Sequence, residues 1–165
     1  MAISLSSLKS TKRHDPPSIL LYGVDGVGKT SLAAEFPSPI YLATEGERPP
    51  SDVEMATPGT VESLDDVFNV FRDLLETEHD FKTVIVDSLD GLEPLVWRST
   101  CARLGLNSIE EAGFGKGYVE ADTEWNEYLR AVSALTRAGL YVVQLAHPEV
   151  IRFDSPITDP YSRYQ

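Results

Sequence analysis

The segment from Gly23 to Thr30 constrains the fold of this chain more than any other part of the sequence. It reads Gly-Val-Asp-Gly-Val-Gly-Lys-Thr, which is a complete G-x-x-x-x-G-K-[ST] phosphate-binding loop. The apolar run 18–22 before it predicts a buried strand, and residues 31–36 after it predict a helix that ends at Pro37. A strand, this loop and a helix, in that order, bring a phosphate group to the N-terminus of the helix. The sequence therefore predicts a binding site for a nucleoside triphosphate.

The residue types of the loop each suit one task in phosphate binding. Glycines let backbone N–H groups turn inward without a Cβ clash. The Lys29 ammonium reaches the β- and γ-phosphates, and the Thr30 hydroxyl is a ligand for Mg²⁺. The residues expected to bind ATP or ADP are Gly23, Val24, Asp25, Gly26, Val27, Gly28, Lys29, Thr30 and Ser31.

Strand and helix patterns alternate along the chain, which predicts an α/β fold with a parallel sheet covered on both faces. The predicted strands span 18–22, 39–44, 81–87 and 140–146, and the predicted helices span 31–36, 64–75, 92–104 and 122–138. The length suits one domain. We expect an N-terminal segment 1–17, a core over 18–150 and a C-terminal segment 151–165.

A second motif supplies the carboxylate that a phosphate loop needs. Residues 84–86, Val-Ile-Val, are apolar without alternation, which is typical of a central strand buried on both faces. Asp87 follows directly, where the strand leaves the sheet, and is expected to orient Mg²⁺ and its water together with Thr30. The alternative is that Asp87 only caps the following turn.

Residues 84–92 resemble the second nucleotide motif of RecA-type ATPases, in which serine follows the strand aspartate. In that family the strand after the phosphate-loop helix ends in a glutamate that activates the attacking water. Glu45 stands at the matching point, and Glu47 is the second candidate. The family also places a polar residue at the end of the fourth strand to sense the γ-phosphate. Gln144 and His147 both lie near that point, and His147 is favoured because it falls at the strand exit.

A closer resemblance is to a phage family of AAA-type, RecA-core ATPases related to phage single-strand annealing proteins. It covers about residues 18–150 and is carried by 19–23, 44–46 and 113–118. The resemblance implies a P-loop NTPase fold of the RecA-like kind, a three-layer sandwich around a mostly parallel sheet. Since a RecA-like core continues past its fourth strand and only 148–165 remain here, the core is expected to be truncated at its C-terminus.

The same resemblance implies a function. It implies Mg²⁺-dependent ATP hydrolysis in phage DNA recombination, single-strand annealing or repair, in the cytoplasm of the bacterial host. The implied partners are single-stranded DNA, further copies of the chain, and a phage recombination or single-strand-binding protein.

The net charge of −12, with 14 basic and 26 acidic residues, opposes a broad nucleic-acid-binding surface, which is normally basic. Any such contact must come from a small loop or from an oligomer. Lys116, among flexible glycines, is a candidate to reach a neighbouring subunit's γ-phosphate or a DNA phosphate; the alternative is a solvated lysine. Without a run of eighteen apolar residues, no membrane span is predicted. The single cysteine, Cys101, predicts no internal disulfide and fits a reducing cytoplasm.

Two other classes of protein compete with this interpretation. A GTPase should carry D-x-x-G and N-K-x-D elements, but the sequence has Asp-Ser-Leu-Asp at 87–90 and no N-K-x-D. A small kinase usually adds an arginine-rich lid, which the middle of this chain lacks. A nucleotide-binding assembly module with little or no hydrolysis remains the second alternative, because the binding residues are clearer than the catalytic one.

Overall fold

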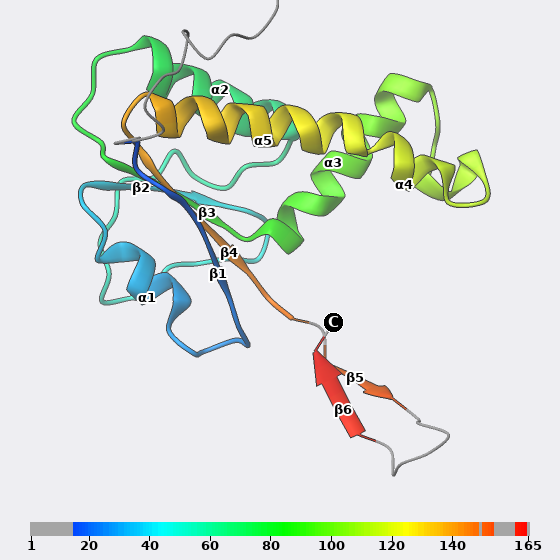
Figure 1. Cartoon of the computed structure of the whole chain (residues 1–165), viewed down its shortest axis with the longest axis horizontal. Helices are drawn as coiled ribbons and strands as arrows, with labels where there is room; N and C mark the ends of the chain where they lie inside the picture. The colour runs from blue at the N-terminus through cyan, green and yellow to red at the C-terminus, as the bar shows by residue number, and fades with distance from the viewer. Residues whose placement is uncertain (1–14, 149, 154–160, 165) are drawn as a thin grey trace, which may run out of the picture.

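The computed structural model describes residues 15–148, 150–153 and 161–164 (Figure 1). Most of the predicted N-terminal segment, residues 1–14, lies outside the described residues. All four predicted strands are present and parallel. They are β1 (Ser18–Tyr22), β2 (Pro39–Ala43), β3 (Thr83–Asp87) and β4 (Tyr141–Ala146), arranged side by side in the order β1-β4-β3-β2.

The helices are α1 (Lys29–Ala34), α2 (Leu64–Glu76), α3 (Leu89–Leu104), α4 (Lys116–Glu120) and α5 (Asp122–Arg137), with a 3₁₀ turn η2 at Ile109–Ala112. Helix α2 begins with a capping box between Ser63 and Asp66, which satisfies two backbone N–H groups. Helix α3 begins earlier than the apolar pattern predicted, because the Ser88 hydroxyl accepts a hydrogen bond from the Gly91 N–H and caps the first turn. It ends at Gly105, which has a φ of 69°.

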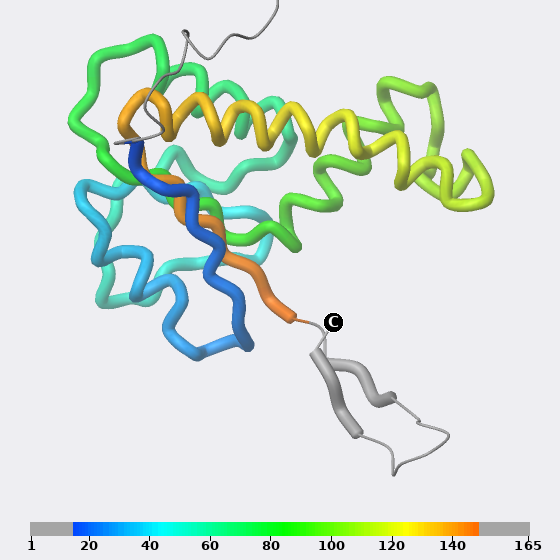
Figure 2. The backbone as a smooth tube through the Cα atoms, viewed as in Figure 1, coloured from blue at the N-terminus to red at the C-terminus, as the bar shows by residue number. Residues whose placement is uncertain are grey.

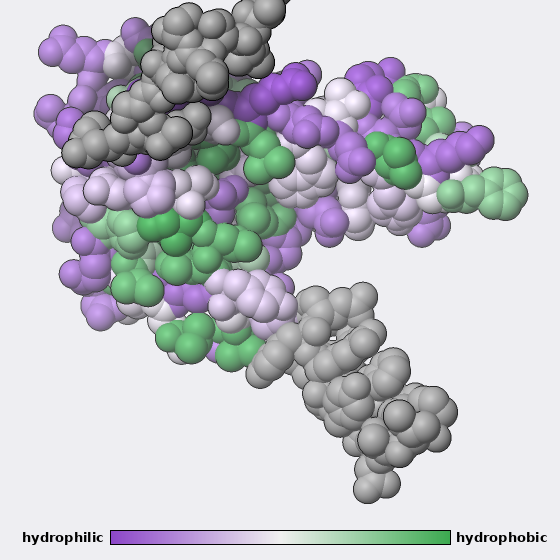
Figure 3. Space-filling model, in the orientation of Figure 1, coloured by the Kyte–Doolittle hydropathy of each residue, from purple (hydrophilic) through white to green (hydrophobic). Residues whose placement is uncertain are grey.

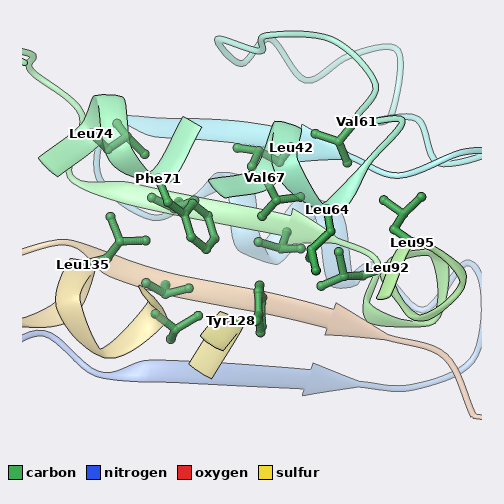
Figure 4. Packing of buried hydrophobic residues seen from close by; sticks show 14 of the residues in the cluster. Leu42, Val61, Leu64, Val67, Phe71, Leu74, Leu92, Leu95, Tyr128 and Leu135 are labelled. Atoms are coloured by element: carbon green, nitrogen blue, oxygen red, sulfur yellow. The ribbon is translucent and has the colours of Figure 1, made fainter. Parts of the chain in front are cut away.

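Helices cover both faces of the sheet, as the strand and helix alternation predicted (Figures 1 and 2). Strand side chains alternate between two cores: Val84 and Val86 of β3 face α2, α3 and α5, whereas Ile85 faces α1. Figure 4 shows the larger core, in which Phe71 of α2 and Tyr128 of α5 meet with ring centroids 5.9 Å apart. The layers are therefore helix, sheet and helix.

The first strand is less buried than its sequence predicted. β1 pairs only with β4 in the described sheet, and Leu20 and Tyr22 are half exposed. Figure 3 shows hydrophobic surface over this strand and the loop that follows it. The apolar run identified a strand correctly, but an edge strand has only one neighbour to cover its flank, so the prediction of a buried strand was wrong.

The C-terminal segment, for which no structure was predicted, contains a two-stranded antiparallel hairpin. It consists of β5 (Val150–Phe153) and β6 (Tyr161–Tyr164). Residues 154–160 and 165 of the predicted segment 151–165 lie outside the described residues. None of the helices in the described part of the chain combines the length and hydropathy needed to cross a bilayer.

Candidate nucleotide-binding site

The carboxyl ends of the four parallel strands meet at one edge of the sheet, where ligands bind in open α/β sheets. The phosphate loop follows β1, and further residues come from the segments that follow β2 and β4. Together they form a hollow of about 310 Å³. It is lined by Asp25, Gly26, Gly28, Lys29, Thr30, Ser31, Glu47, Arg48, Pro50 and His147. Sequence elements that lie far apart in the chain thus contribute to one site.

The phosphate loop has the backbone shape that its glycines predicted. Gly26 and Gly28 have φ values of 72° and 95°, a region that side chains with a Cβ rarely adopt. Lys29 is almost buried, and its Nζ donates to the carbonyls of Gly23 and Val24 at 2.7 and 3.1 Å. The ammonium therefore lies against its own loop, beside the hollow.

Thr30 and Asp87, the predicted Mg²⁺ ligands, lie together. The Thr30 hydroxyl donates to Asp87 Oδ2 at 2.9 Å, and the Tyr41 hydroxyl donates to the same oxygen at 2.9 Å. Burial, and then the neighbouring Asp87 carboxylate, raises the pKa of Tyr41, so the phenol keeps its proton and remains a donor. A hydroxyl and a carboxylate oxygen are hard ligands of the kind that Mg²⁺ prefers, so the residues present fit this ion.

The turn after Asp87 is fixed by Thr44, which directly follows β2. The Ser88 N–H donates to Thr44 Oγ1 at 2.9 Å, and the Thr44 N–H donates to the Asp87 carbonyl at 2.7 Å. Gly91 packs so closely that a Cβ there would lie 2.0 Å from Thr44 Oγ1. Glycine at position 91 is therefore required for α3 to begin beside β2.

The structure separates the two glutamates that follow β2. Glu45 is exposed and lines a different hollow, together with Glu62 and Arg98. Glu47 lines the hollow of the phosphate loop, and its Oε1 lies 3.1 Å from Ser88 Oγ. The second candidate of the sequence analysis is thus the one brought to the phosphate loop.

The two polar residues near the end of β4 also separate. Gln144 is buried towards α5, where it accepts from the Tyr128 hydroxyl at 2.8 Å and donates to Ser18 Oγ at 3.0 Å. His147 lines the hollow instead, with its Nε2 3.0 Å from Asp25 Oδ1. Among the two sensor candidates, only His147 is in a position to contact a ligand in the hollow.

Asp90 is a residue of this site that the sequence analysis missed. Its Oδ1 accepts from the His147 backbone N–H at 2.8 Å, and its Oδ2 lies 2.8 Å from His147 Nδ1 and accepts from the Ser88 hydroxyl at 2.7 Å. Partial burial opposes ionisation of Asp90, but the hydrogen bonds from His147 and Ser88 outweigh it and lower its pKa. An acidic residue in the first turn of a helix looks like ordinary capping, so the sequence carried no signal of this contact.

Lys116 lies away from the hollow of its own chain. It is the exposed first residue of α4, in the arm formed by residues 105–121 between α3 and α5 (Figures 1 and 2). The glycines around it are structurally required: Gly113 and Gly115 have φ near 70°, and a Cβ at Gly117 would lie 1.9 Å from the Ile109 carbonyl oxygen. The path of the chain at these positions therefore requires glycine.

Comparison with known protein families identifies a match over most of the chain. A family model described as an AAA domain matches residues 15–165, which include the whole sheet and every residue of the hollow. A search of the curated proteins found no relative.

Proposed function

The chain belongs to the AAA domain family, and on this premise we propose that it binds ATP with Mg²⁺ beside the phosphate loop and hydrolyses ATP to ADP and phosphate. Membership of this family supports nucleotide binding and ATPase activity. The observation that carries the proposal is the 2.9 Å contact between Thr30 Oγ1 and Asp87 Oδ2, which joins the phosphate loop to the strand carboxylate. A glycine-rich turn with no function would not need this pairing.

Each group of residues in the hollow would have its own role in binding the phosphates and Mg²⁺. Backbone N–H groups of residues 24–29 would hold the phosphate oxygens, and Lys29 would exchange its carbonyl partners, Gly23 and Val24, for them. Thr30 and Asp87 would hold Mg²⁺, which when bound neutralises phosphate charge. The Tyr41 hydroxyl keeps the Asp87 carboxylate oriented towards Thr30.

We assign orientation of the attacking water to Glu47, with Glu45 as the alternative. Glu47 is supported by its place in the lining of the hollow, beside the phosphate loop. His147, at the exit of β4, would contact the γ-phosphate, whereas the partners of Gln144 support a structural role.

Measurement of ATP turnover by the full chain, with Lys29→Ala as the blank, tests this proposal. We expect a Mg²⁺-dependent rate that Lys29→Ala abolishes, because the variant lacks the ammonium that neutralises the β- and γ-phosphates. A rate that persists in Lys29→Ala would contradict hydrolysis at this site. Tight, Lys29-dependent nucleotide binding without turnover would favour the assembly module instead.

We further propose, from the resemblance to phage RecA-core ATPases, that ATP turnover serves phage DNA recombination, single-strand annealing or repair. The partners would be single-stranded DNA, further copies of the chain and a phage recombination or single-strand-binding protein. Comparison of turnover with and without single-stranded DNA tests this role. Stimulation several-fold above the Lys29-dependent basal rate would support it, and a rate indifferent to DNA would remove it and point to a protein partner.

A further inference from the structure

We propose that Asp25, Asp90 and His147 form a switch in which Asp90 fixes the His147 ring and Asp25 holds its outer nitrogen until a γ-phosphate displaces the Asp25 carboxylate. This inference rests on the proposed function, because it assumes that the hollow binds nucleotides. It assigns Asp90 as a positioning residue and Asp25 as an internal competitor of the γ-phosphate.

The inner half of the switch is rigid. Asp90 accepts from both the backbone N–H and the ring Nδ1 of His147, each at 2.8 Å, so one carboxylate fixes both the position and the rotation of the ring. The Ser88 hydroxyl holds Asp90 in turn, at 2.7 Å. Because α3 begins at this point, the ring is tied to the helix that follows the Mg²⁺ ligand Asp87.

The outer half of the switch is weak. His147 Nε2 lies 3.0 Å from Asp25 Oδ1 while Nδ1 faces Asp90, so each ring nitrogen is in contact with a carboxylate. The Asp25 side chain is 91% exposed, whereas that of His147 is 23% exposed. A polar contact with one partner in water is easily exchanged. Glu47 is the third carboxylate facing the ring, with its Oε1 3.8 Å from Nδ1.

The position of Asp25 explains why a γ-phosphate would compete with its carboxylate for His147. Asp25 belongs to the phosphate loop and lines the hollow together with His147, so its carboxylate puts negative charge where the loop is built to receive phosphate. A γ-phosphate offers the same kind of acceptor oxygen with more charge, and it would take the Nε2 donor and leave the Asp25 carboxylate in solvent. ADP has no such group and would leave the Asp25–His147 contact in place.

The test is nucleotide selectivity, the ratio of the Kd for Mg-ADP to the Kd for Mg-AMP-PNP, measured by calorimetry on the full chain. Asp25→Asn should raise this ratio several-fold, because the competing carboxylate is gone. Asp90→Asn and His147→Ala should each lower it several-fold, and Asp90→Glu should restore part of it. The matched control is Asp80→Asn, since Asp80 is exposed, precedes β3 at the opposite edge of the sheet and should leave the ratio unchanged.

The decisive comparison is Asp25→Asn in the His147→Ala background. The proposal requires that Asp25→Asn no longer changes the ratio there, since the carboxylate acts through the ring. An equal increase with and without His147 would mean a general charge effect and would overturn the switch. Partial unfolding weakens the binding of both nucleotides alike and leaves the ratio unchanged. A lower ratio in Asp90→Asn therefore indicates positioning of His147 by Asp90, whereas an unchanged ratio would overturn the switch.

The same titrations separate this inference from the proposed function. Lys29-dependent binding with a ratio that ignores Asp25, Asp90 and His147 would overturn the switch and leave the nucleotide site intact. Failure of the unaltered chain to bind either nucleotide would overturn both.

Discussion

At the scale of single residues, the location of a carboxylate in the folded structure decides its chemical role more than its location in a sequence motif. Glu45 and Glu47 are two residues apart, yet they line different hollows, because Gly46 between them has a φ of 92° and redirects the chain. The RecA-like pattern named Glu45, whereas the geometry favours Glu47.

This contrast gives a first prediction. Glu47→Gln should lower the rate constant for ATP hydrolysis about 100-fold or more, the usual contribution of a positioned acid or base, while nucleotide binding is retained. Glu45→Gln is the matched control and should change the rate constant less than about twofold on the same reasoning. Single-turnover kinetics with both variants would check this, and a larger loss in Glu45→Gln would return the assignment to Glu45.

A second prediction concerns the contact between Gly91 and Thr44. Gly91→Ala should lower the free energy of unfolding by about 1–3 kcal/mol, because its Cβ would overlap Thr44 Oγ1. Chemical denaturation would measure this loss. In the Thr44→Ala background the added cost of Gly91→Ala should be smaller, since the overlapping oxygen is absent; equal costs in both backgrounds would contradict the contact.

At the scale of secondary-structure elements, α3 and α5 are joined by a buried carboxylate. Glu124 of α5 accepts from Arg103 Nε at 2.7 Å and from the Thr100 hydroxyl at 2.9 Å. Burial alone would raise the pKa of Glu124, but the hydrogen bonds from Arg103 and Thr100 outweigh it and lower the pKa. This contact holds together the two helices that flank the arm.

The third prediction follows from the lowered pKa of Glu124, which determines how stability should change with pH. A carboxyl whose pKa is lower in the folded than in the unfolded state contributes stability above its unfolded pKa, and this contribution is lost as pH falls through the folded value. Arg103→Ala should therefore lower the melting temperature at neutral pH. The melting temperature of this variant should also decrease less, as the pH falls into the acid range, than that of the unaltered chain. Arg130→Ala, which changes an exposed arginine of α5, should leave the thermal melting profile across pH unchanged. Parallel profiles for Arg103→Ala and the unaltered chain would contradict this role.

The secondary-structure elements also show which parts of the fold could be predicted from the sequence alone. The four strands follow from short apolar runs, and α2 and α5 follow from helical periodicity. The alternation in β4 puts Gln144 on the same side as Val142, towards α5. The order of the strands depends instead on pairings such as Ser18 with Val142, which periodicity does not encode, so the exposure of β1 could not be foreseen. The Asp90–His147 contact joins residues 57 positions apart and was hidden for the same reason.

At the scale of the whole molecule, the acidic charge leaves few places for a contact with phosphate outside the hollow. Lys116 is exposed on the arm, which extends away from the phosphate loop between β1 and α1 (Figure 1), so it could reach a phosphate only in another molecule. Phe114, beside it, is fully exposed, and Tyr118 and Val119 are partly exposed. The arm thus presents one lysine beside exposed apolar side chains, together with the exposed carboxylates of Glu110, Glu111 and Glu120.

The fourth prediction is that Lys116→Ala lowers DNA-stimulated ATP turnover several-fold and spares the basal rate of the isolated chain. Loss of one cation that contacts phosphate in trans explains both effects. Lys82→Ala, at the opposite edge of the sheet before β3, controls for the change in charge. Turnover of Lys116→Ala that equals the unaltered rate at every protein concentration would leave Lys116 as a solvated side chain.

The meeting of three chain segments in one hollow also has a consequence for local unfolding. The segment 46–60 is mostly exposed and touches β2 through isolated bridges at Ala56 and Thr60, so it can open without unfolding the sheet. A ligand that contacts Glu47, Arg48 and the phosphate loop together must be released before this segment opens, and its binding energy is added to the cost of opening. Protease cleavage within 46–60 should therefore slow as the hollow fills, so that the susceptibility of an exposed loop reports occupancy of the site.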